Sequence, residues 1–265
     1  MLGAIAGDMI GKPYEGVPIK TVDFPLFGLG SRFSDDTVLT VAIADALLTE
    51  RAYVDVVHEY GRMYPRCGFS RQFSYWLRSG SREPYGSFGN GSAMRVSPVA
   101  WRHDTLDDVL DEAERSAAIT HDHPEGIRGA LATAAAVFLA RTGASKDAIR
   151  AAITESFGYD LATSIENLRP DYVFDVTCQG TVPAALIAFL DSADFESAVR
   201  NAVSLGGDAD TLACITGSVA EAYYGGVPRA IAARVWALLD ERLRKVTAEF
   251  RARYVEPRRP ARGTS

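Results

Sequence analysis

Apolar residues recur at intervals of three and four along most of the chain, a spacing that is typical of amphipathic α-helices. The clearest case is the segment 36–50, which follows Ser34 as an N-cap and carries acids in its first turn. The same pattern predicts helices at 105–117, with Thr105 as the cap, at 126–141, at 145–153, at 184–190, with Pro183 in the first helical position, at 194–203, with Asp194 as the cap, and at 211–224. A first helix should end at the Gly/Pro turn within residues 7–15.

Strand signals are sparse, and the best candidate is the segment 172–176. No linker, shift in composition or internal repeat divides the chain. These patterns predict an all-α, single-domain helical bundle over residues 1–250. Residues 251–265 hold five arginines among prolines and small residues, and we expect them to form a solvated C-terminal tail.

Composition narrows the class of protein. The chain has 265 residues, of which 47% are hydrophobic, and its 28 basic and 34 acidic residues give a net charge of −6. A broad nucleic-acid groove is therefore disfavoured, although a local basic patch is not excluded. The first ten residues lack a basic region and contain Asp8, so they predict neither a signal peptide nor a membrane span. The three cysteines are widely spaced and predict reduced core residues of a cytoplasmic protein.

Two acidic clusters carry the candidate chemistry, Ser34-Asp35-Asp36-Thr37 and Asp208-Ala209-Asp210-Thr211. Acids at a helix N-terminus are already favoured by about 0.3–1 kcal/mol, so the first cluster alone has a plain structural explanation. The second cluster follows two glycines that permit a sharp turn, and it gathers carboxylate and hydroxyl oxygens compactly. Because neither cluster contains Cys or His, Mg²⁺, Mn²⁺ or Ca²⁺ is favoured over zinc.

The second cluster also matches a DxDxT pattern in which the first aspartate of haloacid-dehalogenase-type phosphatases acts as the nucleophile. That motif ends an apolar β-strand of a Rossmann-like domain, usually near the N-terminus. Here the preceding residues 204–207 are Ser-Leu-Gly-Gly, and the motif lies near the end of the chain. The phosphatase interpretation is therefore the weaker one.

Three further segments combine glycines with polar groups, namely 7–15 (GDMIGKPYE), 86–95 (GSFGNGSAMR) and 120–126 (THDHPEG). Backbone N–H groups of the second segment could cradle phosphate oxygens, with Arg95 nearby, although most glycine-rich loops are plain turns. The two histidines of the third segment are spaced i, i+2 and cannot share a helix face. A contact to substrate is therefore more plausible than a helical metal pair.

With the two acidic clusters, these segments occur in an order that resembles the ADP-ribosylglycohydrolase family. The resemblance implies an orthogonal all-α bundle, a binuclear Mg²⁺ or Mn²⁺ centre, and hydrolysis of the N- or O-glycosidic bond that joins ADP-ribose to a modified acceptor. The implied metal ligands are Ser34, Asp35, Asp36, Asp208, Asp210 and Thr211. Ser34 stands where the family more commonly has Thr, which keeps the hydroxyl but removes a methyl group.

The resemblance also assigns substrate contacts. The loop residues Gly86, Ser87, Phe88, Gly89, Asn90 and Gly91 would wrap the diphosphate, and His121 would lie beside the distal ribose or the phosphates. Tyr159, with Phe157, is a candidate for stacking on adenine, although buried aromatic residues are more often part of a core. Glu15 is the expected acid/base, and Asp35 and Asp36 are the further catalytic candidates.

Two alternatives remain open from the residues alone. A binding module that holds ADP-ribose without cleaving it would be expected to lack Glu15 or a metal ligand, and every one of these residues is present. A hydrolase of a free ADP-ribose derivative or of another glycoside would keep the same site. ADP-ribose is the expected product, with a protein side chain as the favoured acceptor, but arginine, serine, a nucleic-acid base, a polymer unit and a small molecule all remain possible acceptors.

Overall fold

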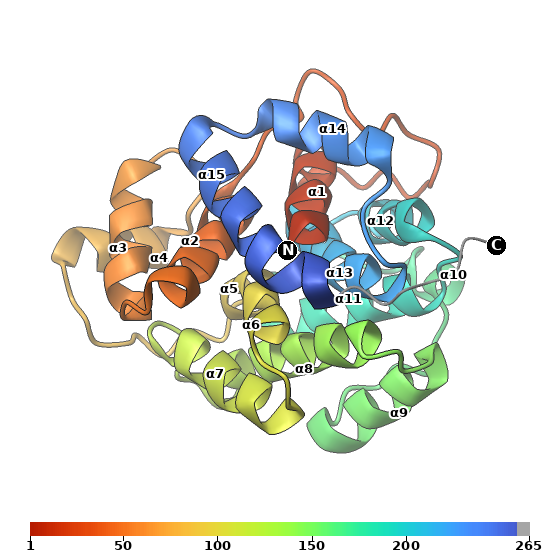
Figure 1. Cartoon of the computed structure of the whole chain (residues 1–265). Coiled ribbons are helices and arrows are strands. Elements are labelled where there is room, and N and C mark those ends of the chain that lie inside the picture. The colour runs from red at the N-terminus through yellow and green to blue at the C-terminus, as the bar shows by residue number, and fades with distance from the viewer. Residues whose placement is uncertain (259–265) are drawn as a thin grey trace.

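The computed structural model describes residues 1–258, which form a bundle of α-helices (Figure 1). The helices are α1 (Leu2–Gly11), α2 (Asp35–Thr49), α3 (Tyr53–Met63), α4 (Arg71–Ser79), α5 (Gly91–Arg95), α6 (Ser97–Arg102), α7 (Leu106–Ala118), α8 (Pro124–Arg141), α9 (Lys146–Phe157), α10 (Ile165–Leu168), α11 (Cys178–Leu190), α12 (Phe195–Ser204), α13 (Ala209–Tyr223), α14 (Arg229–Leu238) and α15 (Glu241–Phe250). Within residues 1–258 there is no strand, only isolated bridges between Glu15 and Gly207 and between Gly89 and Thr177. The predicted all-α fold is confirmed.

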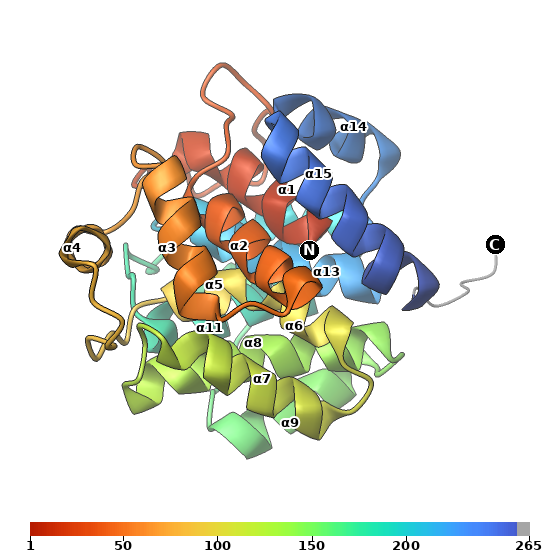
Figure 2. The same cartoon turned by 60° about the vertical axis from the view of Figure 1, so that its left-hand side comes forward.

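Helices α1 and α13 form the centre of the bundle, with α7, α8 and α9 on one side and α14 and α15 on the other (Figures 1 and 2). Three glycines, Gly3, Gly7 and Gly11, line the face of α1 that meets α13. A Cβ atom at any of them would overlap a backbone carbonyl of α13, at residues 217, 213 and 209 in turn. This order shows that the helices run antiparallel with their backbones in contact, so the end of α1 meets the start of α13.

Side-chain caps fix several helix starts at the predicted positions. Ser34 Oγ accepts from the amide of Asp36 (3.2 Å), and Thr105 Oγ1 accepts from the amide of Asp108 (3.1 Å). Asp194 forms a capping box at the start of α12. These local contacts satisfy N–H groups that the first helical turn leaves unpaired, which is why the sequence alone located them.

Two predictions near residue 177 are wrong. The segment 172–176 is not a strand, and helix α11 begins at Cys178 rather than after Pro183. The cap is Thr177, whose Oγ1 accepts from the amide of Gly180 at 3.1 Å, so the helix starts upstream and Pro183 lies inside it. The segment 172–176 instead runs in irregular conformation to the edge of the cavity described below.

The prediction of a solvated tail from Arg251 is wrong for residues 251–258. Arg251–Val255 forms a π-helical turn that continues α15, and Glu256–Arg258 forms a 3₁₀ turn. Arg251 is buried and pairs with Glu221 at 2.7 Å, while Glu221 also accepts from the amino group of Met1 at 2.7 Å. A charged network therefore holds this turn against the centre of the bundle; residues 259–265 lie outside the described part.

All three cysteines are free thiols. Cys178 and Cys214 are buried as predicted, but Cys67 is only half-buried. Cys67 lies in a loop, and its backbone carbonyl accepts from the amide of Asp35 at 3.0 Å. No helix within residues 1–258 has the length and apolar character needed to cross a membrane.

Candidate active site

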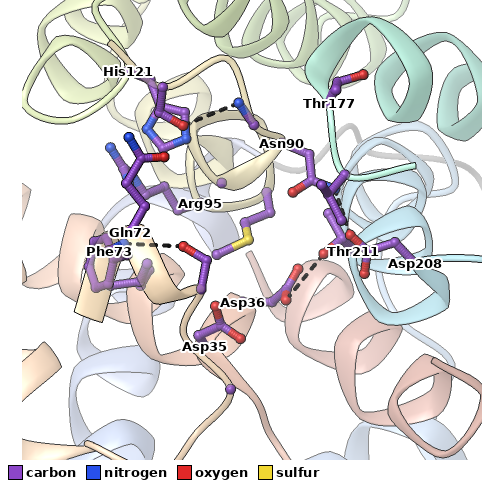
Figure 3. A pocket seen from close by; sticks show the side chains of 18 of the residues that line it. Asp35, Asp36, Gln72, Phe73, Asn90, Arg95, His121, Thr177, Asp208 and Thr211 are labelled. Carbon is purple, nitrogen blue, oxygen red and sulfur yellow. Dashed lines mark hydrogen bonds between the residues drawn. The ribbon is translucent and has the colours of Figure 1, made fainter. Parts of the chain in front are cut away.

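A cavity of about 470 Å³ lies where the end of α1, the starts of α2 and α13, and the glycine-rich loop before α5 converge. Its acidic end holds Asp8, Glu15, Asp35, Asp36, Asp208 and Asp210, with Asp8 beneath the surface of the cavity. Its loop end is formed by residues 86–91 together with Arg95 and His121. The two ends face each other across the cavity (Figure 3).

Asp8 organises the first acidic cluster from below. Its carboxylate accepts from the amide and hydroxyl of Ser34 (2.9 and 2.7 Å) and from the amide (3.1 Å) and hydroxyl of Thr37. Ser34 Oγ also lies 3.1 Å from Asp36 Oδ2. Ser34 Oγ is therefore engaged within the protein. Asp8 was not among the predicted site residues, and its position in the segment 7–15 was the one signal for such a role.

The second cluster is positioned by its turn and by a neighbouring amide. Gly206 and Gly207 have φ values of 65° and 122°, which only glycine adopts readily, and Gly207 O accepts from the amide of residue 16 at 2.8 Å. Asn90 Nδ2 donates to Asp208 at 2.7 Å, and Thr211 Oγ1 lies 3.4 Å from Asp36. The structure thus brings together all the predicted acidic residues.

Burial and mutual repulsion raise the pKa of four of these carboxyl groups. Burial comes first and the charge of Asp210 second in raising the pKa of Asp8 to about 6 and that of Asp35 to about 7. The same two causes raise the pKa of Asp36 and of Asp208 well above the usual range. A divalent ion would remove this repulsion, because it favours the ionised form of every carboxylate around it.

The donor set fits a hard cation. Asp36 Oδ1 and Asp210 Oδ1 are buried and have no hydrogen-bond partner within residues 1–258. Ligand oxygens of Asp8, Asp36 and Asp210 lie within 4.8 Å of one another, as do those of Glu15, Asp208 and Asp210. These two groups of three carboxylates share Asp210. All of their ligand atoms are oxygens, which are the ligands that Mg²⁺ and Mn²⁺ prefer.

The loop end uses most of its backbone amides within the protein. The amide of Gly86 donates to Asp122 (2.7 Å), that of Gly89 to Ser87 Oγ (3.2 Å), and that of Asn90 to the carbonyl of residue 176 (2.8 Å). The last contact, with the Gly89–Thr177 bridge, ties the loop to the start of α11. The loop therefore shapes the cavity wall, and Gly91 is already the first residue of α5.

Arg95 and His121 give the loop end its polarity. Arg95 is buried; its Nη2 donates to Ser116 O (3.0 Å) and Thr120 Oγ1 (2.9 Å), while Nε and Nη1 have no partner within residues 1–258. Burial lowers its pKa to about 10, so it stays charged at neutral pH. Burial and the charge of Arg95 lower the pKa of His121 well below its usual range, so this ring is neutral. An anion in the cavity would meet the charge of this guanidinium, whose two unpaired donors lie buried at the cavity wall.

The aromatic residues at the cavity differ from those the sequence suggested. Tyr159 is buried in the core, and neither it nor Phe157 lines the cavity. Aromatic side chains that do line it are Phe73, Tyr85, Phe88 and Phe174. Phe88 and Phe174 are 46% and 52% exposed, which leaves ring surface for a ligand. Phe174 was missed because its segment was interpreted as a strand.

Comparison with known proteins identifies the class. A sequence profile of the ADP-ribosylglycohydrolase family matches residues 1–260, and the chain therefore belongs to this family of glycosidic-bond hydrolases. The phosphatase alternative is wrong, because the residues before Asp208 form a turn after α12 rather than a strand.

Particular relatives agree with this class. The chain is 28% identical to ADP-ribosylhydrolase ARH3 of Mus musculus, over 85% of this chain and 82% of the relative. It is 26% identical to ADP-ribosylarginine hydrolase Tri1 of Pseudomonas putida (strain GB-1), over 86% of this chain and 71% of the relative. A solved structure titled ADP-ribosylglycohydrolase-related protein complex superposes with a TM-score of 0.71 at 27% identity, covering 94% of this chain and 95% of that one.

Proposed function

We propose that the protein hydrolyses the glycosidic bond between ADP-ribose and a modified acceptor, with two divalent ions, Mg²⁺ or Mn²⁺, bound at the acidic end. The observation that carries this proposal is the polarity of one cavity: clustered carboxylates face a buried, partly unpaired Arg95. ADP-ribose has matching chemistry, a diol-bearing ribose at one end and a diphosphate next to it. A cavity of about 470 Å³ is in the usual range for a ligand of this size.

The acidic end supports ion binding through Asp36 and Asp210, each of which has a buried Oδ1 without a partner within residues 1–258, and through the carboxylates around them. Asp35 and Asp208, with Thr211, complete the proposed ligand set, and Ser34 stays a predicted member. Such ions, when bound, supply positive charge that orients ribose hydroxyls and lowers the pKa of a water molecule. The raised pKa values of the surrounding carboxyls support the same assignment.

Glu15 is the proposed acid/base. Its side chain is 39% exposed at the cavity, and its backbone is fixed by the bridge to Gly207. In hydrolysis, the bond from ribose C1″ to the acceptor breaks, the acceptor takes up a proton, and water supplies the hydroxyl that C1″ gains. A carboxylate beside C1″ can stabilise the positive charge that builds there and accept the proton from water. Asp35 and Asp36 are the other candidates for this second role.

The loop end is proposed to bind the remainder of ADP-ribose. The free Nε and Nη1 of Arg95 can bind the diphosphate, because guanidinium groups form charge-assisted hydrogen bonds with phosphate oxygens. His121 is neutral and can donate or accept a hydrogen bond beside the phosphates or the distal ribose. The exposed rings of Phe88 and Phe174 suit a stacked adenine.

The acceptor is proposed to be a protein side chain, and the site of action the cytoplasm. The names of the relatives point to ADP-ribosylated substrates, and one of them specifies arginine. The free cysteines agree with a reducing compartment.

A panel of substrates tests the proposal. Proteins or peptides ADP-ribosylated on arginine or serine, ADP-ribosylated nucleic acid, poly-ADP-ribose and a free ADP-ribose glycoside are incubated with Mg²⁺, Mn²⁺ or EDTA. We expect release of ADP-ribose from at least one of them, and no release in EDTA. Binding of ADP-ribose without cleavage of any substrate would indicate a binding module, and turnover of simple phosphomonoesters would contradict the assigned chemistry.

A further inference from the structure

Lys12 places an ammonium group inside the acidic end. Its side chain is 8% exposed, and Nζ donates to Asp210 Oδ2 at 2.8 Å and to Glu15 Oε2. The loop at Gly68 closes over it, since a Cβ at that glycine would lie 3.6 Å from Nζ. Lys12 follows the last residue of α1 and precedes Pro13, so its backbone is held in the 3₁₀ turn Lys12–Tyr14.

The two groups of three carboxylates differ in how many of their members contact Lys12. Glu15 and Asp210, both ion-paired with Lys12, belong to the group that Asp208 completes. The other group adds Asp8 and Asp36 to Asp210, and among the residues 1–258 the hydrogen bonds of Lys12 go to Glu15 and Asp210 rather than to Asp8 or Asp36. The ammonium therefore occupies one of the two positions at which a divalent ion could bind.

An ammonium and a divalent ion compete for the same oxygens. The Lys12 ammonium donates to Asp210 Oδ2 at 2.8 Å and to Glu15 Oε2, so its partners are oxygens that such an ion would also use. Two positive charges a few ångströms apart repel by about 1 kcal/mol in water and several-fold more in a partly buried site. An ion that binds among Glu15, Asp208 and Asp210 must therefore displace Nζ from its partners.

We propose that Lys12 is a tethered competitor for one of the two divalent ions, so that the ions bind with unequal affinity. This inference rests on the proposed binuclear centre. The first ion binds at Asp8, Asp36 and Asp210, where the ammonium contacts only Asp210. The second binds only when Lys12 leaves Asp210 and Glu15. Lys12 is thus a residue that sets metal affinity, and it keeps the second carboxylate group partly neutralised before the second ion arrives.

The test is a Mn²⁺ titration, followed by calorimetry and by native mass spectrometry, on the wild type, Lys12→Met and Lys12→Arg. Lys245→Met is the matched control, because it removes the same charge from an exposed position outside the cavity. We expect two sites in the wild type that differ in affinity by about 10-fold or more. Lys12→Met should strengthen the weaker site by about 10-fold or more and change the stronger one by less than about 3-fold. Lys12→Arg and Lys245→Met should behave as the wild type does.

Other results overturn the inference. Equal affinities in the wild type, or a weaker site that Lys12→Met leaves unchanged, would make Lys12 a purely structural ion-pair partner. Failure of every variant to bind Mn²⁺ would instead refute the binuclear centre. Circular dichroism and melting in EDTA verify the fold; should Lys12→Met not fold, Lys12→Gln keeps a polar group and tests the same loss of charge. Anomalous diffraction from Mn²⁺-soaked crystals at limiting metal should give one peak in the wild type and two in the Lys12 variant.

Discussion

The two ends of the cavity are charged in opposite senses, and each is incomplete in a different way. The acidic end gathers more carboxylates than its one lysine can neutralise, so their pKa values rise. The loop end buries the guanidinium of Arg95, whose Nε and Nη1 have no partner and which forms no ion pair with a carboxylate in the described part of the chain. One end carries an excess of negative charge, and the other carries a buried positive charge.

The opposite charges of the two ends would orient a ligand in the cavity before any chemistry begins. An ADP-ribosyl group bound backwards would place its diphosphate among the carboxylates and its ribose hydroxyls at Arg95, and the repulsion would oppose it. The proposed orientation places the diphosphate beside Arg95 and the neutral ribose hydroxyls at the acidic end, whose excess charge the divalent ions would offset. Substitutions that alter one end alone should therefore separate ion binding from ADP-ribose binding.

The largest effect should follow Asp210→Asn, which alters the carboxylate that both metal groups share. We expect turnover to fall by about 10⁴-fold, because losing bound ions removes several kcal/mol of stabilisation of the transition state. The rise in melting temperature on adding Mn²⁺ should disappear as well. Asp147→Asn on the exposed start of α9 is the control. Normal Mn²⁺ stabilisation in Asp210→Asn would place the ions elsewhere.

Glu15→Gln should come next and should divide the acidic end into its two tasks. Turnover is expected to fall by about 10²–10⁴-fold, the usual range for a positioned acid/base, while the affinity for ADP-ribose persists. Steady-state kinetics and calorimetry measure the two quantities, with Glu83→Gln as an exposed control. Nearly full activity of Glu15→Gln on every cleavable substrate would transfer the role to Asp35 or Asp36.

Arg95→Met should affect the loop end alone. Losing hydrogen bonds from a charged donor costs about 1.5–3 kcal/mol, so ADP-ribose should bind about 10–100-fold more weakly. Adenosine, which carries no phosphate, should bind the variant and the wild type equally, and Mn²⁺ binding should not change. Arg78→Met, at an exposed position on α4, provides the matched control. An equal loss of adenosine binding would show that the substitution had damaged the cavity as a whole.

The acidic end should make the metal-free protein more stable as the pH falls from 8 to 5. Asp35 and Asp8 take up protons near pH 7 and pH 6 in the folded protein, whereas unfolded carboxyls stay ionised until about pH 4. The folded state then binds more protons than the unfolded state, so acidification stabilises it. His121, whose lowered pKa keeps it neutral when folded, opposes this trend below about pH 6.5.

Melting curves in EDTA measure this effect, and a rise of about 3–6 °C corresponds to roughly 1–2 kcal/mol. Asp36→Asn should flatten the rise, because it removes part of the repulsion. Saturating Mn²⁺ should abolish it, because bound ions keep the carboxylates ionised. A metal-free melting temperature that falls steadily over this range would contradict the predicted protonation of the acidic end.

The smallest effect separates two aromatic residues. Phe174→Leu should weaken adenosine binding by about 2–10-fold, which matches the 0.5–1.5 kcal/mol of a stacked ring. Tyr159→Leu should cost stability but leave adenosine affinity within about 2-fold, because Tyr159 does not line the cavity. Calorimetry with adenosine and thermal melting give both numbers. The opposite pattern would restore Tyr159 as the stacking partner and require the cavity to extend under α9.

Local chemistry made part of the fold predictable. Helices α2, α7 and α12 begin at side-chain caps, and a cap is visible from a few neighbouring residues. Helices α3 and α14 begin without a side-chain cap, after Ala52 and Pro228, and neither was predicted. A cap alone was not sufficient either, because α4 and α15 begin at the caps Ser70 and Asp240 and were also missed. Packing against the bundle stabilises such helices, and a single sequence does not reveal which segments will meet.

The residues of the candidate site also divide into those with a local sequence signal and those without one. The acidic residues and the loop could be predicted because their chemistry is unusual within a few neighbouring positions. Asp8, Lys12 and Phe174 could not, since each acquires its role from residues far away in the chain: Thr37, Asp210 and the cavity wall. Tyr159 illustrates the reverse error, because a ring in a loop and a ring in a core have the same sequence signature.

The glycine face of α1 fixes the distance between the carboxylates that α1 and α13 contribute to the acidic end. Because the backbones of α1 and α13 touch at Gly3, Gly7 and Gly11, no compressible layer of side chains separates Asp8 from Asp210. The gap between the two halves of the site is fixed by the radii of backbone atoms, which do not vary with repacking of the core. Substitutions elsewhere in the bundle can shift other helices while the spacing between the carboxylates of α1 and α13 stays constant.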